Sequence, residues 1–436
     1  AVIVPIKHAP TADESMREYF FLLIMVLPSA MATAGIETES LTMSDPRTRE
    51  AALLMSRFAE RTGLTSGQTP QRYLWTDAFA VCNYLGLARA TGDETYTRLA
   101  LQLVDQVHHT LGRHRDDDSR TGWISGLSET DGQQHPTRGG LRIGKSLPER
   151  APGDSYDERL EWDRDGQYFH YLTKWMHALD QLARNTRQSR FSAWAGELAH
   201  SAFTAFSYLP SPGREPRRMY WKMSIDLTRP LVPSMGQHDP LDGYITTWQI
   251  HSTLKSLPQP GAVPDLEETG EGFATMYRQG NLATPDPLGL GGLLVDAWRV
   301  RQLTEQGTQL DAHLLDRLLD AALTGLRYYA RSGELRQPAR YRLAFRELGL
   351  SIGLHALERM QQAILQGAES HPGDLRLRAR IQDLVQYLSL RGEIESYWRN
   401  PVQQQAATWI EHQDINEVML ATSLAPDGFL ELLPPE

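Results

Sequence analysis

Four acidic side chains crowd into eight residues of the sequence, at Glu158, Glu161, Asp163 and Asp165. Trp162 lies among them, and a strongly amphipathic segment follows. Carboxyl groups packed together beside aromatic rings can have their pKa values driven apart by burial and mutual repulsion, which is what a general acid requires. We expect Asp163 or Glu161 to be that acid, whereas Asp165 is placed to cap the following helix. The alternative is structural, with Asp163 binding Arg164 or a nearby amide.

A second group of chemically capable residues comprises His238, Asp239 and Asp242. Asp239 stands directly before Pro240, which is typical of a helix cap, but His238 and Asp242 have no such structural role. A carboxylate here, Asp242 or Asp239, could act as the base that complements the acid of the first group. Two such carboxyl groups perform glycoside hydrolysis.

A third group begins at Trp409 and His412 and continues to Asp414 and Glu417. Asp414 and Glu417 have capping-box spacing, in which each side chain satisfies a free backbone donor of the first helical turn. His412 precedes that cap, so it should face the same end of the helix. Paired with His238, it could remove and return a proton beside a carbonyl carbon, which is sugar epimerisation or isomerisation.

A basic stretch lies in a glycine-rich segment of an otherwise acidic chain, and it contains Arg138, Arg142, Lys145 and Arg150. A local cationic cluster favours an anionic substrate such as a uronate or a phosphorylated sugar. Scattered charge on a solvated loop is the alternative. The partner expected for the chain is therefore a small saccharide, with an anionic group as an open possibility.

Spacing and composition exclude several other chemistries. His170 and His177 are separated by about 10.5 Å of helical rise, too far to share a metal ion, and no metal or cofactor motif occurs. The net charge is 44 − 54 = −10, which argues against binding to nucleic acid through phosphate contacts. The single cysteine, Cys82, excludes an intrachain disulfide.

Helical periodicity runs through nearly the whole chain from residue 46, with no convincing alternating strand. The expected helices are 46–62, 71–91, 94–111, 166–184, 191–208, 241–256, 265–279, 291–305, 309–329, 341–361, 373–390 and 414–424. Their connections alternate between long and short. If successive helices are antiparallel, the long connections all emerge at one end, where loops of this length are usually functional.

Twelve helices in six hairpins with elaborate loops at one end resemble the (α/α)6 toroids of the six-hairpin glycosidase superfamily and of the N-acylglucosamine 2-epimerase relatives. The similarity extends over 46–424 and rests on this pattern and on the stretches 72–77, 161–170 and 238–243. It implies an all-α (α/α)6 toroid over 43–436, with a central cavity for a saccharide. The leading hypothesis is a glycoside hydrolase. The alternatives are a sugar 2-epimerase or isomerase, or a toroid that binds a sugar or protein without catalysis.

Aromatic walls suit sugars, because the C–H faces of a pyranose pack on rings while polar side chains hold the hydroxyls. Aromatic residues expected in the cavity wall are Trp75, Tyr168, Trp175, Trp221 and Trp248. The residues expected to bind substrate are Trp75, Asp77, Trp123, Arg142, Lys145, Tyr168, His170, His412 and Asp414. Of these, we expect Trp75, Asp77, Trp123 and Arg142 to share one concavity with Asp163, His238 and His412.

Residues 1–42 differ in pattern from the helical part of the chain. The apolar run from Tyr19 to Leu27 and the small residues after it resemble a short export signal, but the run is too short to span a bilayer. We expect 1–42 to be an extension outside the toroid and the protein to be cytoplasmic, with export as the alternative. No integral membrane span is expected.

Overall fold

The computed structural model describes residues 45–211, 217–258, 261, 263–278, 280–366 and 372–434. The predicted extension, 1–42, lies outside these residues. None of the described helices is long and apolar enough to cross a membrane.

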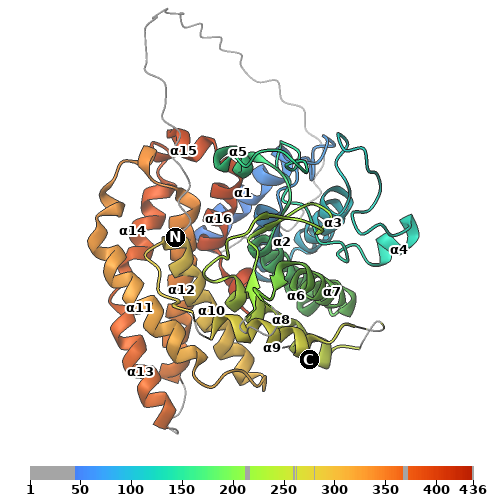
Figure 1. The fold of residues 1–436 in the computed structure, drawn as a ribbon. Coiled ribbons are helices and arrows are strands. Elements are labelled where there is room, and N and C mark those ends of the chain that lie inside the picture. The colour runs from blue at the N-terminus through green and yellow to red at the C-terminus, as the bar shows by residue number, and fades with distance from the viewer. Residues whose placement is uncertain are drawn as a thin grey trace, which may run out of the picture.

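Within the described ranges, six helices form a closed inner ring (Figure 1). They are α2 (Leu74–Thr91), α6 (Phe169–Thr186), α8 (Asp239–Ser256), α10 (Pro287–Glu305), α12 (Ala344–Gln366) and α16 (Gln413–Leu424). Each contacts the next, and α16 returns to contact α2.

A second layer of helices packs outside this ring. It consists of α1 (Pro46–Arg61), α3 (Glu94–Leu111), α7 (Ser189–Phe206), α9 (Leu266–Tyr277), α11 (Leu314–Ser332), α13 (Pro372–Val385) and α14 (Ser389–Arg399). Inner and outer helices alternate along the chain, apart from the outer pair α13 and α14. The structure therefore confirms the predicted all-α (α/α)6 toroid.

The two layers differ in how their side chains are distributed. In α2, every residue from Leu74 to Leu87 is buried, because the helix has neighbours on all sides. In α11, the buried residues recur every three or four positions, as in Leu314, Leu318 and Ala322. A single apolar stripe is typical of a helix with one face in solvent.

The long connections gather at one end of the ring. The connection from α3 to α6 contains α4 (Glu129–Gln134), α5 (Glu158–Asp163) and β1 (Gln167–Tyr168). The connection from α7 to α8 contains β2 (Ser207–Tyr208), β3 (Arg218–Met219), β4 (Lys222–Met223) and β5 (Pro230–Val232). The antiparallel sheet β1-β4-β5 joins the two connections, and β2 pairs with β3. Strands of two or three residues are too short to show alternation in the sequence.

The segment 391–413, expected to be a loop, instead contains most of α14 and all of α15 (Ala407–Ile410). Helix α14 buries only a narrow stripe that includes Ile394 and Trp398. Its third buried residue, Glu395, is accommodated because Arg47 and His355 bind the carboxylate at 2.7 and 3.0 Å. The partners of this buried acid are distant in sequence, so the buried face of α14 contains a charged residue and does not show an apolar helical pattern.

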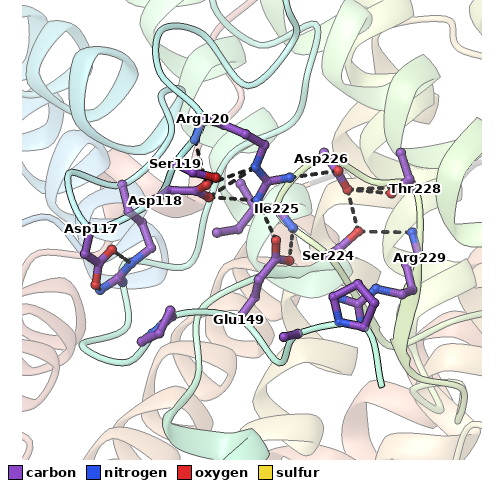
Figure 2. A pocket seen from close by; sticks show the side chains of 14 residues that line it. Asp117, Asp118, Ser119, Arg120, Glu149, Ser224, Ile225, Asp226, Thr228 and Arg229 are labelled. Atoms are coloured by element: carbon purple, nitrogen blue, oxygen red, sulfur yellow. Dashed lines mark hydrogen bonds and ion pairs between the residues drawn. The ribbon is translucent and has the colours of Figure 1, made fainter. Parts of the chain in front are cut away.

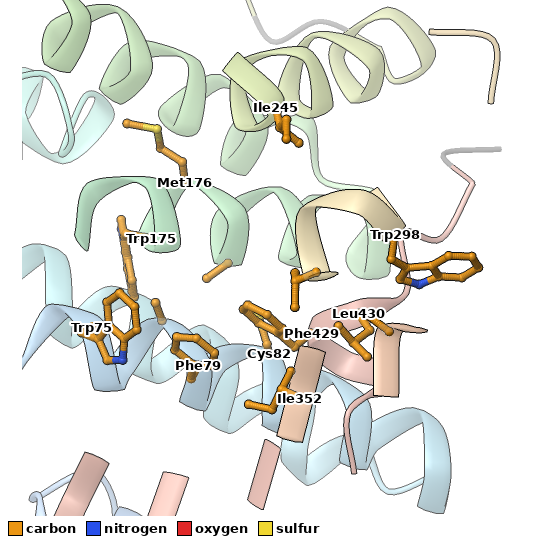
Figure 3. Close-up of a cluster of buried hydrophobic side chains, with 14 of the residues drawn as sticks. Trp75, Phe79, Cys82, Trp175, Met176, Ile245, Trp298, Ile352, Phe429 and Leu430 are labelled. Carbon is orange, nitrogen blue, oxygen red and sulfur yellow. The ribbon is translucent and has the colours of Figure 1, made fainter. Parts of the chain in front are cut away.

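The other end of the ring is closed by residues 425–434, which contain α17 (Asp427–Leu430) and which we call the C-terminal plug. The Phe429 ring stacks on Phe79 with 4.4 Å between centroids (Figure 3). His177 Nε2 donates to the Phe429 carbonyl at 3.0 Å. The plug approaches α2 so closely that a Cβ on Gly428 would lie 1.9 Å from the Cys82 carbonyl oxygen. Only glycine fits there.

Candidate functional site

A cavity with about 270 Å³ open to water occupies the centre of the ring. All six inner helices contribute from their N-terminal halves, through residues such as Trp75, His170, Asp239, Gly289, Phe345 and Ile415. The six helices therefore run in the same direction, and their N-termini surround the open end. Phe429 of the C-terminal plug is the floor.

Four aromatic side chains form one wall of the cavity. Trp162 and Trp221 meet edge to face at 4.8 Å, and both belong to the long connections. Trp221 lies 5.2 Å from Tyr168 and is stacked at 5.9 Å on His170. The connections thus place an aromatic surface, with an imidazole in it, against the polar residues of α8.

His238 and Asp239 stand side by side where α8 begins. The His238 Nε2 faces the Leu282 carbonyl oxygen at 2.7 Å, so this nitrogen carries the proton and Nδ1 keeps its lone pair. Burial lowers the pKa of His238. Burial, with the charge of Asp242 as a second cause, raises the pKa of Asp239 to about 7. Among the described residues, Asp239 Oδ2 has no hydrogen-bond partner. The pair can offer a base and a protonated carboxyl group at the same point.

His170, in the first turn of α6, is a second neutral imidazole on the cavity wall. Burial lowers its pKa to about 3, and the Lys174 ammonium adds to the shift. Its Nδ1 is buried without a partner among the described residues.

Three other carboxylates on or beside the cavity each bind a cation. Asp242 accepts from Lys174 at 2.8 and 2.9 Å. Burial acts to raise the pKa of Asp242, but Lys174 and Arg299 together hold it below its ordinary value. Asp296 contacts Arg299 at 3.1 Å, although burial raises its pKa to about 7. Asp286 binds Arg346 and caps α10 through the Gly289 N–H.

The structure brings seven of the predicted site residues to this cavity. They are Trp75, Lys145, Tyr168, His170, His238, Asp239 and Asp242. The other predicted residues lie elsewhere, so the expectation of one concavity shared by Trp75, Asp77, Trp123, Arg142, Asp163, His238 and His412 holds only for Trp75 and His238.

The two acids expected from the first group do not line the cavity. Glu161 is buried and bound by Lys222 and Arg150, each at 3.0 Å. Asp163 is exposed at the end of α5. Asp165 is not a cap either, because α6 begins at Phe169, and its buried carboxylate instead binds Arg142 at 2.6 Å.

The remaining predicted binding residues have structural partners. Asp77 is buried beside Arg72, 3.4 Å away, and accepts from the Tyr73 N–H. Trp123 is buried against Gly132 of α4, and Arg142 is held by Asp165.

The third group also lies outside the cavity. His412 donates from Nδ1 to the Thr408 carbonyl oxygen at 3.2 Å and is itself the residue preceding α16. Asp414 and Glu417 both bind Arg61 of α1, at 2.6 and 2.7 Å, and so do not form a capping box.

Two aromatic residues expected in the wall are elsewhere. Trp175 is fully buried and donates to His108 Nε2 at 3.2 Å. Trp248 packs against Gly270 of α9.

Sequence reasoning missed four charged residues of the cavity region, Lys174, Asp286, Asp296 and Arg346. Two signals could have found half of them. Asp286 precedes Pro287 as Asp239 precedes Pro240, and both pairs open an inner helix. Lys174 follows His170 by four positions and so shares its helix face.

A separate hollow of about 410 Å³ lies among the long connections, around Arg120 (Figure 2). Arg120 binds Asp118, Glu149 and Asp226 at 2.7–2.9 Å. The charges of these four groups are paired with one another. The ion pairs therefore hold the connection that carries Lys145 and α5 against the connection that carries Trp221.

Comparison with known proteins gives only distant similarities. No protein-family model and no curated protein matches the chain. A sugar epimerase from a ruminal bacterium has a solved structure that is 8% identical, with a TM-score of 0.42, over 78% of this chain and 86% of that one. The cellobiose 2-epimerase of Bacillus thermoamylovorans is 10% identical, with a TM-score of 0.41, over 78% and 87%.

Proposed function

We propose that the chain is a sugar epimerase or isomerase that transfers a proton at the carbon beside the carbonyl group of a reducing sugar. One observation carries the proposal. An imidazole with a fixed tautomer, His238, stands next to a carboxyl group, Asp239, that keeps its proton up to a pH of about 7, in an aromatic-walled cavity. Base and acid with pKa values set apart by their surroundings are what such a reaction needs.

In the proposed reaction, His238 Nδ1 takes the proton from C2 of the open-chain sugar. The electron pair of that C–H bond forms a C1–C2 double bond, and the carbonyl oxygen accepts the proton of Asp239. Return of the His238 proton to C1, with loss of the O2 proton to Asp239, gives the ketose. The epimer arises if the His238 proton is relayed through neutral His170, which accepts a proton on one ring nitrogen and gives one from the other to the opposite face of C2, while the O1 proton returns to Asp239.

Glycoside hydrolysis, the leading hypothesis from sequence, has less support. Its expected acids, Glu161 and Asp163, do not line the cavity, and Asp242 is held by Lys174. Among the described residues, Asp239 then has no unpaired carboxylate beside it to act as base.

The test is deuterium incorporation. Aldoses incubated with the protein in D2O should gain deuterium at C1 of a ketose or C2 of an epimer, both detected by NMR. His238→Asn and Asp239→Ala should each lower the rate at least about 100-fold. The matched control is His412→Asn, because His412 lies outside the cavity and its loss should leave the rate unchanged. Release of a free sugar from an aryl glycoside without deuterium uptake would instead establish hydrolysis.

A further inference from the structure

Within the described part of the chain, one cation of the central cavity has no carboxylate partner. Three cationic side chains line the cavity, Lys145, Lys174 and Arg346. Lys174 is neutralised by Asp242 at 2.8 Å, and Arg346 by Asp286. Lys145 Nζ makes neither a hydrogen bond nor an ion pair with any residue in the described part of the chain.

The sequence makes this position unusual. The chain has 44 basic residues but only five lysines, Lys7, Lys145, Lys174, Lys222 and Lys255. Lys222 is fully buried, and its Nζ donates to Glu161 Oε1 and to the carbonyl oxygens of Glu161 and Arg164 at 2.7–3.0 Å. Among the residues that the structure describes, the Lys145 ammonium group has only the Tyr73 ring as a neighbour, 5.5 Å from the ring centroid.

Burial at this position is costly for a cation. It lowers the pKa of Lys145, although the charges of Asp163 and Asp165 act in the other direction. Asp165 is already bound by Arg142 and Arg115. A half-buried ammonium group without a counter-ion among the described residues gains from an anion that enters the same cavity.

A second unsatisfied donor lines the same wall. Trp75 is 6% exposed, and its Nε1–H has no acceptor among the described residues. The Tyr171 ring connects this donor with Lys145. It lies 5.4 Å from the Trp75 ring and 5.5 Å from the Tyr73 ring, and the Lys145 ammonium group lies over the Tyr73 ring. The N-termini of the inner helices add a positive field at this end of the ring.

We propose that the substrate carries an anionic oxygen group, a carboxylate or a phosphate, that binds Lys145. The inference rests on the proposed function for the rest of the ligand, a monosaccharide in the central cavity. Of the four basic residues that the sequence offered as an anion site, only Lys145 is then available to bind a substrate. The other three already bind carboxylates: Arg138 binds Glu197, Arg142 binds Asp165 and Arg150 binds Glu161.

Equilibrium binding to the full chain tests this proposal without any turnover. The probes are 1,5-anhydroglucitol, its 6-phosphate, and its C6 carboxylate, 1,5-anhydroglucuronate; none of the three has a carbonyl group at C1, so none can react. Calorimetry should show at least about tenfold tighter binding of one anionic probe than of the neutral one. Whichever anion binds more tightly identifies the group.

Lys145→Met should remove that preference while affinity for 1,5-anhydroglucitol stays the same, and Lys145→Arg should keep most of it. Lys255→Met is the matched control, because Lys255 is 64% exposed and binds Glu267 outside the cavity. If Lys145→Met does not fold, Lys145→Arg and the salt dependence of wild-type binding still decide the matter.

Equal affinity of the wild type for neutral and anionic probes would overturn the proposal, as would equal loss of both in Lys145→Met. Either result leaves the proton-transfer reaction intact, because deuterium incorporation is measured separately. Conversely, anion preference without deuterium uptake would refute the reaction and retain the role of Lys145.

Discussion

Asp239 and Asp242 stand three positions apart at the start of one helix, yet their carboxyl groups are held in opposite protonation states. Lys174 keeps Asp242 ionised, whereas burial keeps Asp239 protonated up to a pH of about 7. The difference comes from a lysine on α6 and from the way α8 packs. Both causes act through space, so neither is visible in the stretch 238–243 itself.

The raised pKa of Asp239 predicts a specific pH dependence of stability. Between the ordinary pKa of 3.8 and the folded value of about 7, the unfolded chain has lost this proton and the folded chain retains it. Stability from this group therefore falls as pH rises through that window and stays low above it. Asp239→Asn should raise the melting temperature relative to wild type at pH 8 and have little effect near pH 4, while slowing deuterium incorporation.

Asp118→Asn provides a control of opposite sign for that experiment. Hydrogen bonding to Arg120 outweighs burial and lowers the pKa of Asp118 to about 2. Its contribution to stability is present above pH 3.8 and is lost as pH falls toward 2. This variant should therefore melt below wild type at pH 8. A melting temperature of Asp239→Asn that does not change relative to wild type between pH 4 and pH 8 would contradict the assignment.

At the scale of single residues, the sequence predicted which residues of α8 line the cavity better than it predicted the chemical role of each residue. His238 and Asp242 were recognisable because neither has a capping role in the sequence, and Asp239 was kept as a candidate although its position is typical of a helix cap. Glu161 and Arg142 have the same chemistry in the sequence but bind partners that folding brings from other segments, Lys222 and Asp165. Spacing along the chain does not reveal which buried charge has a partner.

At the scale of elements, helices α10 and α12 touch through glycines. A Cβ on Gly291 would lie 2.0 Å from the Gly349 carbonyl oxygen, and one on Gly353 would lie 2.6 Å from Gly291 Cα. The neighbouring Gly292 lines the cavity, and a Cβ there would meet nothing within 4 Å. Adjacent glycines thus have opposite surroundings.

We therefore expect opposite effects from two adjacent substitutions. Gly291→Ala should force the two helices apart and lower the free energy of unfolding by about 1–3 kcal/mol or more. Gly292→Ala should raise it by up to about 1 kcal/mol, because alanine costs less conformational entropy in a helix. Urea denaturation measures both. The methyl group of Gly292→Ala enters the cavity, so it should also weaken sugar binding; similar stability changes in the two variants would contradict this packing.

The order of helices was predictable because amphipathic periodicity and helix caps are local. Helix α14 was not predicted as a separate helix. Its buried side includes Glu395, and this carboxylate is buried only because Arg47 of α1 binds it. The strands β1 to β5 are held by pairing between two long connections rather than by local preference. Elements that depend on distant partners are the ones that periodicity misses.

At the scale of the whole molecule, the two ends of the described chain make unequal contributions. Helix α1 has its own start, because Asp45 accepts from the N–H groups of Arg47 and Thr48. Residues 425–434 instead fill the closed end of the ring.

Deletion of residues 1–42 should change the melting temperature by less than about 2 °C, since the described helices begin after residue 42.

Phe429→Ala should lower the free energy of unfolding by about 3–5 kcal/mol, because it leaves a void between Phe79 and His177. Thermal melts and urea titrations check the two results. A large loss on deletion of 1–42 would show that the apolar run at 20–26 packs on the toroid.

Ring closure also sets the timing of folding during synthesis. Helix α2 must pack against α16 and α17, which lie roughly 330 residues later. At about 5–20 residues per second, roughly 17–70 s pass between the emergence of these segments from the ribosome. Through that interval, the apolar surface of α2 that α16 and the C-terminal plug later cover stays open. Nascent chains halted before residue 413 should therefore be cleaved rapidly by added protease and should recruit chaperones, whereas released full-length chains should resist cleavage.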